Sequence, residues 1–261
     1  MDFLSVKDKC FVISGVANKK SVAYSAAKIL SDNGANLVFT VQSSDHAEKV
    51  SKLFPNSKVL IVDVENSKTI SAMGEELKGN GLRIAGFLHS MAFANYSEPK
   101  PFHQTGWDDF AQAARISCFS LIEMTNALTD LMEEGASVVT VSISNTRATN
   151  YGYMGPIKAM LDSTVAFLAK SLSDKKIRVN AVCSGPLKTS ASAGIPGYIE
   201  NYLFAEKLTL RKQALKTDEV GDTIAFLMSP RASGINATGL MVDAGMSCNY
   251  FDEEVVGLAH S

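Results

Sequence analysis

A tyrosine and a lysine near the middle of the chain have the chemistry to stabilise a negative charge that develops on a reacting oxygen. The stretch 150–158 reads N-Y-G-Y-M-G-P-I-K. If it opens a helix, Tyr151 and Lys158 stand two turns apart and project from one face, about 10 Å apart along the axis. The phenol can donate a hydrogen bond or a proton, while the lysine supplies a positive charge and donors for a ribose. This spacing predicts a catalytic pair around a nicotinamide sugar, although an isolated pair more often flanks a helix without a chemical role.

The composition excludes several classes of function. With 261 residues, 46% hydrophobic and 20% charged, the chain suits one soluble α/β domain over residues 1–261. The net charge of -2 gives no case for nucleic-acid binding. Cys10, Cys118, Cys183 and Cys248 lie far apart without metal-ligand spacing, so we expect no disulfide framework, no metal site and a cytoplasmic location. Charges within residues 1–9 and the lack of a long apolar stretch argue against a signal peptide and a membrane span.

The elements that must position the pair are short strands alternating with helices. Apolar runs rich in β-branched residues occur at Cys10–Ser14, Asn36–Val41, Lys58–Val62, Ile84–Leu88, Ser137–Ile143, Arg178–Val182 and Leu240–Val242. This alternation predicts a single-domain, Rossmann-like, doubly wound parallel sheet of about seven strands with helices on both faces. We also expect a long helix from about Trp107 to Glu133 and another over Met154–Leu172.

The connection after the first run could hold a pyrophosphate. Gly15 permits a tight turn, and the helix that follows, ending near Asn33, would point its free N–H groups at an anion above the strand ends. The motif G-x-G-x-x-G is absent, because Ser21 and Ala23 occupy positions where glycine is more familiar. By itself the loop is equally compatible with an ordinary connection.

The end of the second run indicates which nicotinamide nucleotide binds. An arginine or lysine at this point would welcome a 2′-phosphate, but none occurs before Lys49. Uncharged Gln42 and acidic Asp45 therefore favour NADH over NADPH. The same residues could simply cap the next helix, with Ser44 as N-cap.

The third and fourth runs end in residues that suit an adenine and a ligand crossing the sheet edge. Asp63 can accept from an adenine amino group and Val64 can line the ring, although Asp63 could equally cap a helix that begins near Ser67. The small residues of 89–94 (H-S-M-A-F-A) leave room for a ligand at the carboxyl end of the fourth strand. We interpret His89 as a hydrogen-bonded core residue, since no nearby carboxylate in the sequence would orient it.

After the sixth run, the chain could enclose a bound ligand. A Gly-Pro turn within 183–189 would expose backbone groups near a nicotinamide carboxamide. Small residues mixed with aromatic ones then favour a mobile substrate lid near 191–206. A surface helix with a flexible entry is the alternative.

Together these stretches resemble the NADH-dependent enoyl-acyl-carrier-protein reductases of bacterial fatty-acid synthesis, a branch of the short-chain dehydrogenase/reductase superfamily. The resemblance covers nearly the whole chain. It rests on S-G-V-A-N-K-K-S-V-A-Y from Ser14, F-T-V-Q from Phe39, D-V at Asp63, H-S-M-A-F-A from His89, N-Y-x-x-M-G-x-x-K from Asn150, R-V-N-A-V-C-S-G-P-L-K-T from Arg178 and V-D-A-G from Val242. Ordinary short-chain dehydrogenases carry tyrosine four residues before the lysine, where this chain has Met154.

The resemblance implies hydride transfer from NADH to the β carbon of a trans-2-enoyl thioester on acyl carrier protein, with Tyr151 stabilising the enolate oxygen, and a homotetramer. The implied cofactor contacts are Gly15, Ser21 and Val22 with the diphosphate, Gln42 with the adenosine ribose, Asp63 and Val64 with adenine, Met91 beside the nucleotide, Lys158 with the nicotinamide ribose, and Leu187, Lys188, Thr189, Ser190 and Ala191 over the nicotinamide and diphosphate. The implied substrate contacts are Ala94, Met154 and Tyr198. No metal is implied.

The chain departs from the family near the fifth strand. The family usually carries a second tyrosine there, whereas residues 141–146 read V-S-I-S-N-T, and the segment to Tyr151 is slightly short. Either Tyr151 suffices, or Tyr153, Ser142 or Ser144 assists, or the substrate is not a long fatty acyl chain. The family's glycine after Met91 is here Ala92, which would narrow the pocket.

These departures leave two alternative functions open. One is a same-fold NAD(P)H reductase of another conjugated carbonyl or of a carrier-bound intermediate of a secondary pathway. The other is a non-catalytic dinucleotide-binding protein. Retention of both Tyr151 and Lys158 argues against the second, because a binding module has no need of the phenol.

Overall fold

In a computed structural model, which describes residues 3–98, 100–189, 192 and 197–258, seven parallel strands form one sheet in the order β3-β2-β1-β4-β5-β6-β7. The strands are β1 (Cys10–Ser14), β2 (Asn36–Val41), β3 (Lys58–Ile61), β4 (Ile84–His89), β5 (Met132–Ile143), β6 (Arg178–Ser184) and β7 (Thr238–Val242). The order reverses between β1 and β4, where Ser14 lies opposite His89. A crevice at the carboxyl ends of these two strands is the usual ligand site of such sheets. The doubly wound fold is therefore confirmed, and each strand overlaps a predicted run.

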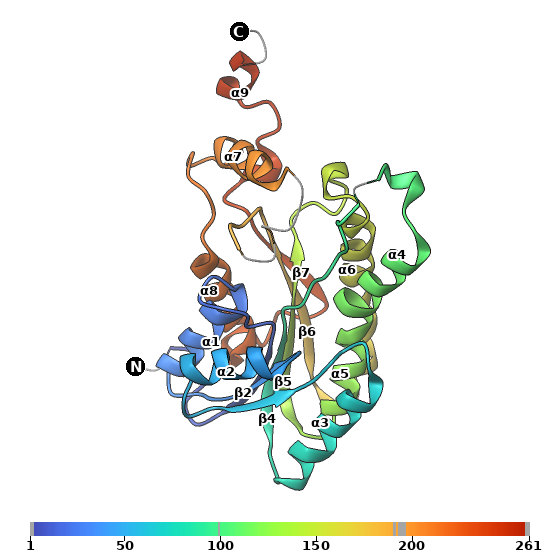
Figure 1. Cartoon of the computed structure of the whole chain (residues 1–261). Helices are drawn as coiled ribbons and strands as arrows, with labels where there is room; N and C mark the ends of the chain where they lie inside the picture. The colour runs from blue at the N-terminus through green and yellow to red at the C-terminus, as the bar shows by residue number, and fades with distance from the viewer. Residues whose placement is uncertain (1–2, 99, 190–191, 193–196, 259–261) are drawn as a thin grey trace.

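Helices cover both faces of the sheet (Figure 1). On one side lie α1 (Val22–Asp32), α2 (Ser44–Leu53) and α8 (Thr217–Met228), and on the other α3 (Ser67–Gly79), α4 (Trp107–Ala114), α5 (Ser120–Leu128) and α6 (Met154–Ser171). Helices α7 (Tyr198–Leu208) and α9 (Glu253–Leu258) extend beyond the carboxyl ends of the strands. Short 3₁₀ turns occupy Phe102–Gln104, Thr149–Tyr151, Ser173–Lys175, Pro230–Ala232 and Met246–Cys248.

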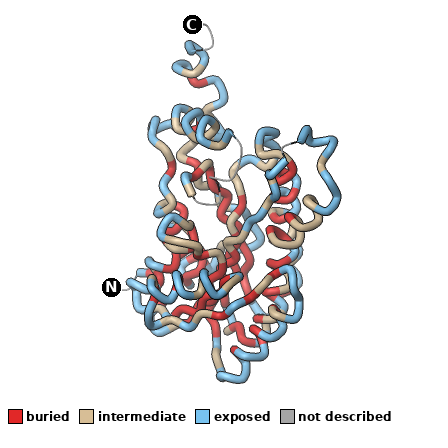
Figure 2. The backbone as a smooth tube through the Cα atoms, in the orientation of Figure 1, coloured by how far each residue is buried: buried red, intermediate tan, exposed pale blue. Residues whose placement is uncertain are grey.

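The central strands supply side chains to two hydrophobic cores. Along β1, Phe11 and Ile13 pack into the core that includes α1 and α8, whereas Val12 packs into the core that includes α5 and α6. Successive side chains of a strand point to opposite faces, so a strand covered on both sides reads as one continuous apolar run. Figure 2 shows this burial along the strands and the inner helix faces.

Helices α1 and α8 pack with their backbones unusually close. A Cβ added at Gly221 of α8 would stand 2.7 Å from the Ser25 Cβ of α1. The Ser25 hydroxyl also donates a 2.7 Å hydrogen bond to the Asp218 carboxylate. The helix that follows the first loop is thereby fixed against a helix near the other end of the chain.

The predicted long helix from Trp107 to Glu133 was wrong in its continuity and its end. A π-helical turn, Arg115–Phe119, separates α4 from α5. The Ser120 hydroxyl donates to the Ile116 carbonyl at 2.7 Å, and a side chain that binds this carbonyl disturbs the regular helical pattern. Helix α5 ends at Leu128, and Glu133 belongs to β5, which begins earlier than the predicted run.

Two predicted helix caps also differ. Ser43, not Ser44, precedes α2 and accepts from the His46 amide. Helix α3 begins at Ser67 as expected, but Asn66 caps it by accepting from the Lys68 amide. The carboxylate of Asp63 instead accepts from the Glu65 amide at 3.0 Å.

Candidate active site

Tyr151 does not share a continuous helix with Lys158, so the predicted helical geometry was wrong. Tyr151 ends the 3₁₀ turn Thr149–Tyr151, and α6 begins only at Met154. Between them Gly152 adopts φ 59° and ψ -146°, a conformation that interrupts a right-handed helix and is open chiefly to glycine. The direction of the Tyr151 phenol is therefore set by this turn and not by the helix.

The Tyr151 phenol is a neutral hydrogen-bond donor at ordinary pH. Burial raises its pKa well above the usual value, and the nearby phenols of Tyr198 and Tyr96 raise this pKa further. A protonated phenol that ionises with difficulty can donate to a developing oxyanion without carrying charge itself.

Lys158 lies in the first turns of α6, where only 4% of its surface is exposed. Its ammonium group donates a 2.8 Å hydrogen bond to the carbonyl of Val141 in β5. Burial lowers the pKa of Lys158 to about 8, while the Asp162 carboxylate acts in the opposite direction. One N–H of the ammonium group points to the sheet, so the other two N–H donors can bind a ligand.

Two polar side chains lie beside Lys158, the buried Ser142 and the half-buried Asp162. Burial raises the pKa of Asp162, while Ser142 and Lys158 lower it. The Ser142 hydroxyl and one oxygen of Asp162 form no hydrogen bond of standard geometry within the described residues. Ser142 is packed against this carboxyl group, and its role as an assistant to Tyr151 stays a prediction.

The loop after β1 fits an anionic group. Gly15 has φ 98°, and a Cβ there would stand 1.9 Å from the Ser90 carbonyl oxygen, so only glycine allows this approach of β1 to β4. The Ser21 hydroxyl accepts from the amides of Ala17 and Asn18 at 3.0 and 3.1 Å, which fixes the loop. No side chain caps the first turn of α1, so its amides suit a diphosphate.

The other predicted nucleotide contacts line the same edge of the sheet. Gln42 is exposed at the end of β2, Asp63 and Met91 are partly buried, and Val22 and Val64 are buried. The residues predicted to contact adenosine thus follow β2 and β3, which lie on the β1 side of the point where the strand order reverses. These residue roles stay predictions.

The segment after β6 is bound to α7. The Tyr198 hydroxyl donates to the Leu187 carbonyl and accepts from the Leu187 amide, both at 2.9 Å. The Thr189 amide donates to the Ser192 hydroxyl at 2.9 Å, and Lys188 is exposed. The predicted contacts at Ser190 and Ala191 lie outside the described residues.

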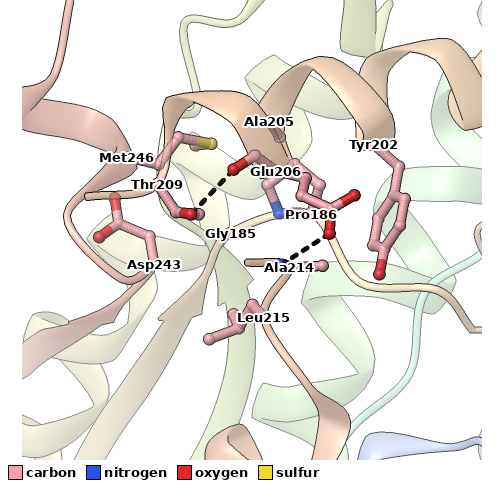
Figure 3. A pocket seen from close by; sticks show the side chains of 10 residues that line it. All are labelled: Gly185, Pro186, Tyr202, Ala205, Glu206, Thr209, Ala214, Leu215, Asp243 and Met246. Atoms are coloured by element: carbon pink, nitrogen blue, oxygen red, sulfur yellow. Dashed lines mark hydrogen bonds between the residues drawn. The ribbon is translucent and has the colours of Figure 1, made fainter. Parts of the chain in front are cut away.

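Helix α7 is anchored at its carboxyl end. In Figure 3, a small pocket beneath α7 is lined by Gly185, Pro186, Tyr202, Ala205, Glu206, Thr209, Ala214, Leu215, Asp243 and Met246. The Glu206 carboxylate accepts from the Ala214 amide at 3.3 Å, and the Thr209 hydroxyl donates to the Glu206 carbonyl at 2.9 Å. A substrate lid near 191–206 stays a prediction, and its residues 191 and 193–196 lie outside the described residues.

The predicted acyl contacts have different environments. Ala94 is partly exposed, whereas Met154 is only 3% exposed and packs in the hydrophobic core. Met154 offers almost no surface in this conformation. Tyr198 remains partly exposed, although its hydroxyl is engaged with Leu187.

His89 is the core residue that the sequence indicates. Its two ring nitrogens lie 3.0 Å from the Thr140 hydroxyl and 2.8 Å from the Ser120 hydroxyl. Burial lowers the pKa of His89 to about 3, with Lys158 acting in the same direction. The ring is neutral and fully engaged, which leaves it no role in proton transfer.

Sequence reasoning missed Tyr96. Its hydroxyl donates to the Tyr151 carbonyl at 3.1 Å, and its ring centroid lies 5.5 Å from that of Tyr153. Tyr153, a proposed assistant to Tyr151, directs its hydroxyl to the Asn95 carbonyl at 2.8 Å. The only signal for Tyr96 was its position just after the ligand-spanning residues 89–94.

A doubly wound sheet with a glycine turn at its switch point, a neutral phenol and a buried lysine defines a dinucleotide-dependent oxidoreductase. Among the described residues, no group of three or more His, Cys, Asp or Glu side chains could hold a metal ion. Within the same residues, no helix has the length and apolar character needed to cross a membrane.

The family follows from comparison with known proteins. Residues 15–247 match the family model described as enoyl-(acyl carrier protein) reductase, and the chain belongs to this family. It is 36% identical over 245 residues to the NADH enoyl-acyl-carrier-protein reductase of Enterococcus faecalis, covering 92% of this chain and 98% of the relative. It is 33% identical to the NADPH enzyme of Staphylococcus aureus, with 93% and 98% covered.

Solved structures show the same fold. The NADH enzyme of Aquifex aeolicus superposes with a TM-score of 0.88 at 32% identity, covering 93% of this chain and 97% of that chain. The Bacillus cereus enzyme, solved with NADP⁺ and an indole naphthyridinone, gives a TM-score of 0.88 at 33% identity, with 92% and 96% covered. These similarities give no support to a non-catalytic protein or to a reductase of a secondary pathway.

Proposed function

We propose that this enzyme reduces trans-2-enoyl thioesters of acyl carrier protein in fatty-acid synthesis, with NADH as the reductant. The observation that carries the proposal is the Tyr151 phenol on the turn just before α6, the helix whose first turns hold the buried Lys158. Membership of the enoyl-(acyl carrier protein) reductase family supports the same chemistry.

The residues of the chain handle the charge that this reaction creates. When bound, NADH would supply a hydride to the β carbon of the substrate, and the double-bond electrons would then move toward the thioester oxygen. Tyr151 donates a hydrogen bond to that oxygen as it becomes negative, and a proton added at the α carbon completes the saturated thioester. Lys158 holds the nicotinamide ribose and contributes a positive charge near the reacting groups.

The loop after β2 favours NADH. Gln42 and Asp45 are both exposed where an adenosine ribose would lie, and the Asp45 carboxylate would repel a 2′-phosphate. Relatives named for NADH and for NADPH occur at similar identity, so the proposed preference for NADH rests on Gln42 and Asp45 of this chain.

A homotetramer is part of the proposal. Met160 and Phe167, seven residues apart on one face of α6, are 41% and 77% exposed, and Phe119 of the neighbouring π-helical turn is 49% exposed. Large apolar side chains gathered on one helical layer are typical of subunit contacts. The four cysteines are free thiols, which agrees with the proposed cytoplasmic location.

The test measures loss of the absorbance of reduced nicotinamide with crotonyl and longer enoyl thioesters, using NADH and NADPH in parallel. We expect turnover with NADH and a fall in kcat of about 10²-fold or more in Tyr151→Phe, the usual effect of removing one oxyanion donor. Tyr250→Phe is the matched control, because Tyr250 is 82% exposed near the C-terminus. Absence of turnover with every thioester would refute the proposal, and a preference for NADPH would refute its cofactor.

A further inference from the structure

Two tyrosines join the loop after β4 to the turn that carries Tyr151. The Tyr96 hydroxyl donates to the Tyr151 carbonyl at 3.1 Å, and the Tyr153 hydroxyl donates back to the Asn95 carbonyl at 2.8 Å. Their rings pack at 5.5 Å between centroids with an interplanar angle of 39°. We call Tyr96 and Tyr153 the tyrosine clasp.

Apart from the clasp, the turn is held by backbone hydrogen bonds, from the Tyr151 amide to the Ala148 carbonyl at 3.0 Å and from the Gly152 amide to the Thr149 carbonyl at 3.1 Å. No side chain caps either the 3₁₀ turn Thr149–Tyr151 or the start of α6. Thr149 and Asn150 are exposed. At Gly152, a Cβ would stand 3.6 Å from the Tyr96 ring, so this ring covers the residue that sets the chain direction between Tyr151 and α6.

The loop side of the clasp is firmly attached to the protein. Phe93 exchanges two hydrogen bonds with the Ser117 hydroxyl, its amide donating at 2.9 Å and its carbonyl accepting at 3.2 Å. The Asn95 side chain donates to the Asp109 carboxylate at 2.9 Å. The clasp can therefore transmit the position of a fixed loop to the Tyr151 turn.

The chemistry of the Tyr96 hydroxyl limits its role. A phenol has one proton, and Tyr96 directs it to the Tyr151 carbonyl, so it cannot also donate to a substrate in this arrangement. Burial raises the pKa of Tyr96 to about 12, which keeps that proton in place over the working range of pH. Tyr153 likewise uses its proton on Asn95.

We propose that Tyr96, held by Tyr153, is a positioning residue that fixes the orientation of the Tyr151 phenol for reduction of the enoyl thioester. The inference rests on the proposed function. Support then reaches Tyr151 from the β4 side, in a chain whose β5 carries no tyrosine. The clasp further joins Tyr151 to Ala94, the predicted acyl contact, which directly precedes Asn95.

The first variant is Tyr96→Phe, which keeps the ring and removes only the hydroxyl. We expect kcat for crotonyl and longer enoyl thioesters to fall about ten-fold, since one hydrogen bond and a small misorientation have effects of this size. The dissociation constant of NADH, measured by its fluorescence, should stay within about two-fold, because Tyr96 lies on the acyl side of the predicted site. Tyr153→Phe should give the same pattern and Tyr250→Phe no change.

A double-mutant cycle separates positioning from general destabilisation. If Tyr96 acts through the Tyr151 phenol, Tyr96→Phe should change residual kcat by less than about two-fold in a Tyr151→Phe background. An equal ten-fold loss in both backgrounds would overturn the inference, and so would an unchanged kcat in Tyr96→Phe alone. Wild-type turnover is measured in the same assay, and its absence would overturn the proposed function as well. If the wild type turns over normally but the cycle shows no coupling between Tyr96 and Tyr151, only the role of the clasp is overturned.

Discussion

The buried charge of Lys158 predicts a basic limb in the pH profile of the enzyme. Burial lowers the pKa of this lysine to about 8, which places the loss of its proton inside the range where the enzyme can be assayed. If the charged form holds the nicotinamide ribose, kcat/KM should fall as the pH rises through this value.

The size of the effect follows from the fraction of Lys158 that stays protonated. With a pKa of about 8, roughly nine-tenths is charged at pH ~7 and roughly one-tenth at pH ~9. The expected fall in kcat/KM between these two conditions is about nine-fold. His89 and Tyr96 do not titrate there, because the pKa of His89 is lowered to about 3 and that of Tyr96 is raised to about 12.

The assay is the pH dependence of kcat/KM for NADH with a saturating enoyl thioester. Lys158→Arg is the matched variant, because a guanidinium stays charged over the whole range and its profile should lose the limb even if its activity is lower. A flat wild-type profile up to pH ~9.5, or a limb that persists in Lys158→Arg, would refute the assignment.

The same pKa predicts the opposite trend for stability. In the native state Lys158 loses its proton at a lower pH than in the unfolded chain, so between pH ~8 and pH ~10.5 the unfolded state binds more protons. The contribution of this group to the free energy of unfolding should then increase with pH, by at most about 1.4 kcal/mol per pH unit. Denaturant titrations of the wild type and of Lys158→Met should differ in this slope. A difference of the opposite sign would contradict a lowered pKa.

Three further predictions concern the cofactor loop, the core and the subunit contact. Gly15→Ala should raise the dissociation constant of NADH at least about ten-fold, because its new Cβ would meet the Ser90 carbonyl at 1.9 Å. Unchanged binding of NADH would contradict the role of the loop after β1 in holding the diphosphate. His89→Leu should lower the free energy of unfolding by about 2 kcal/mol in urea titrations, since it leaves the buried Thr140 hydroxyl without its ring partner. If the proposed homotetramer forms through this face, Phe167→Asp should lower the mass found in sedimentation experiments, and an unchanged mass would argue against this face as the contact.

The sheet could be predicted from the sequence because its strands are buried on both faces. Such strands appear as uninterrupted apolar runs, and the runs for β1 and β2 match the structure at both ends. The early start of β5 could not be predicted, because residues 132–136 include two glutamates and a glycine that look like a loop. Pairing with β4 forms this extension, and pairing is not visible in one segment alone.

The residues of the candidate site could be proposed from the sequence, but their local geometry could not be predicted. Tyr151 and Lys158 stand out by type and spacing, but the spacing implied a helix that Gly152 interrupts with a positive φ. A single glycine within an otherwise helical pattern does not reveal which conformation it takes. Tyr96 was missed because its hydrogen bond to Tyr151 spans 55 residues of sequence, and only the fold brings the two together.

The close packing of α1 against α8 has a consequence for the order in which the protein can mature during synthesis. The helix that presents its amides to the predicted diphosphate ends at Asp32, yet the helix that covers its apolar side ends only at Met228. While the ribosome is still making β6, the apolar residues of α1 have no such cover, so the nascent nucleotide site should remain loosely formed. We therefore expect a sharp gain of protease resistance in α1 only when α8 has left the ribosome, late in the synthesis of a chain of 261 residues.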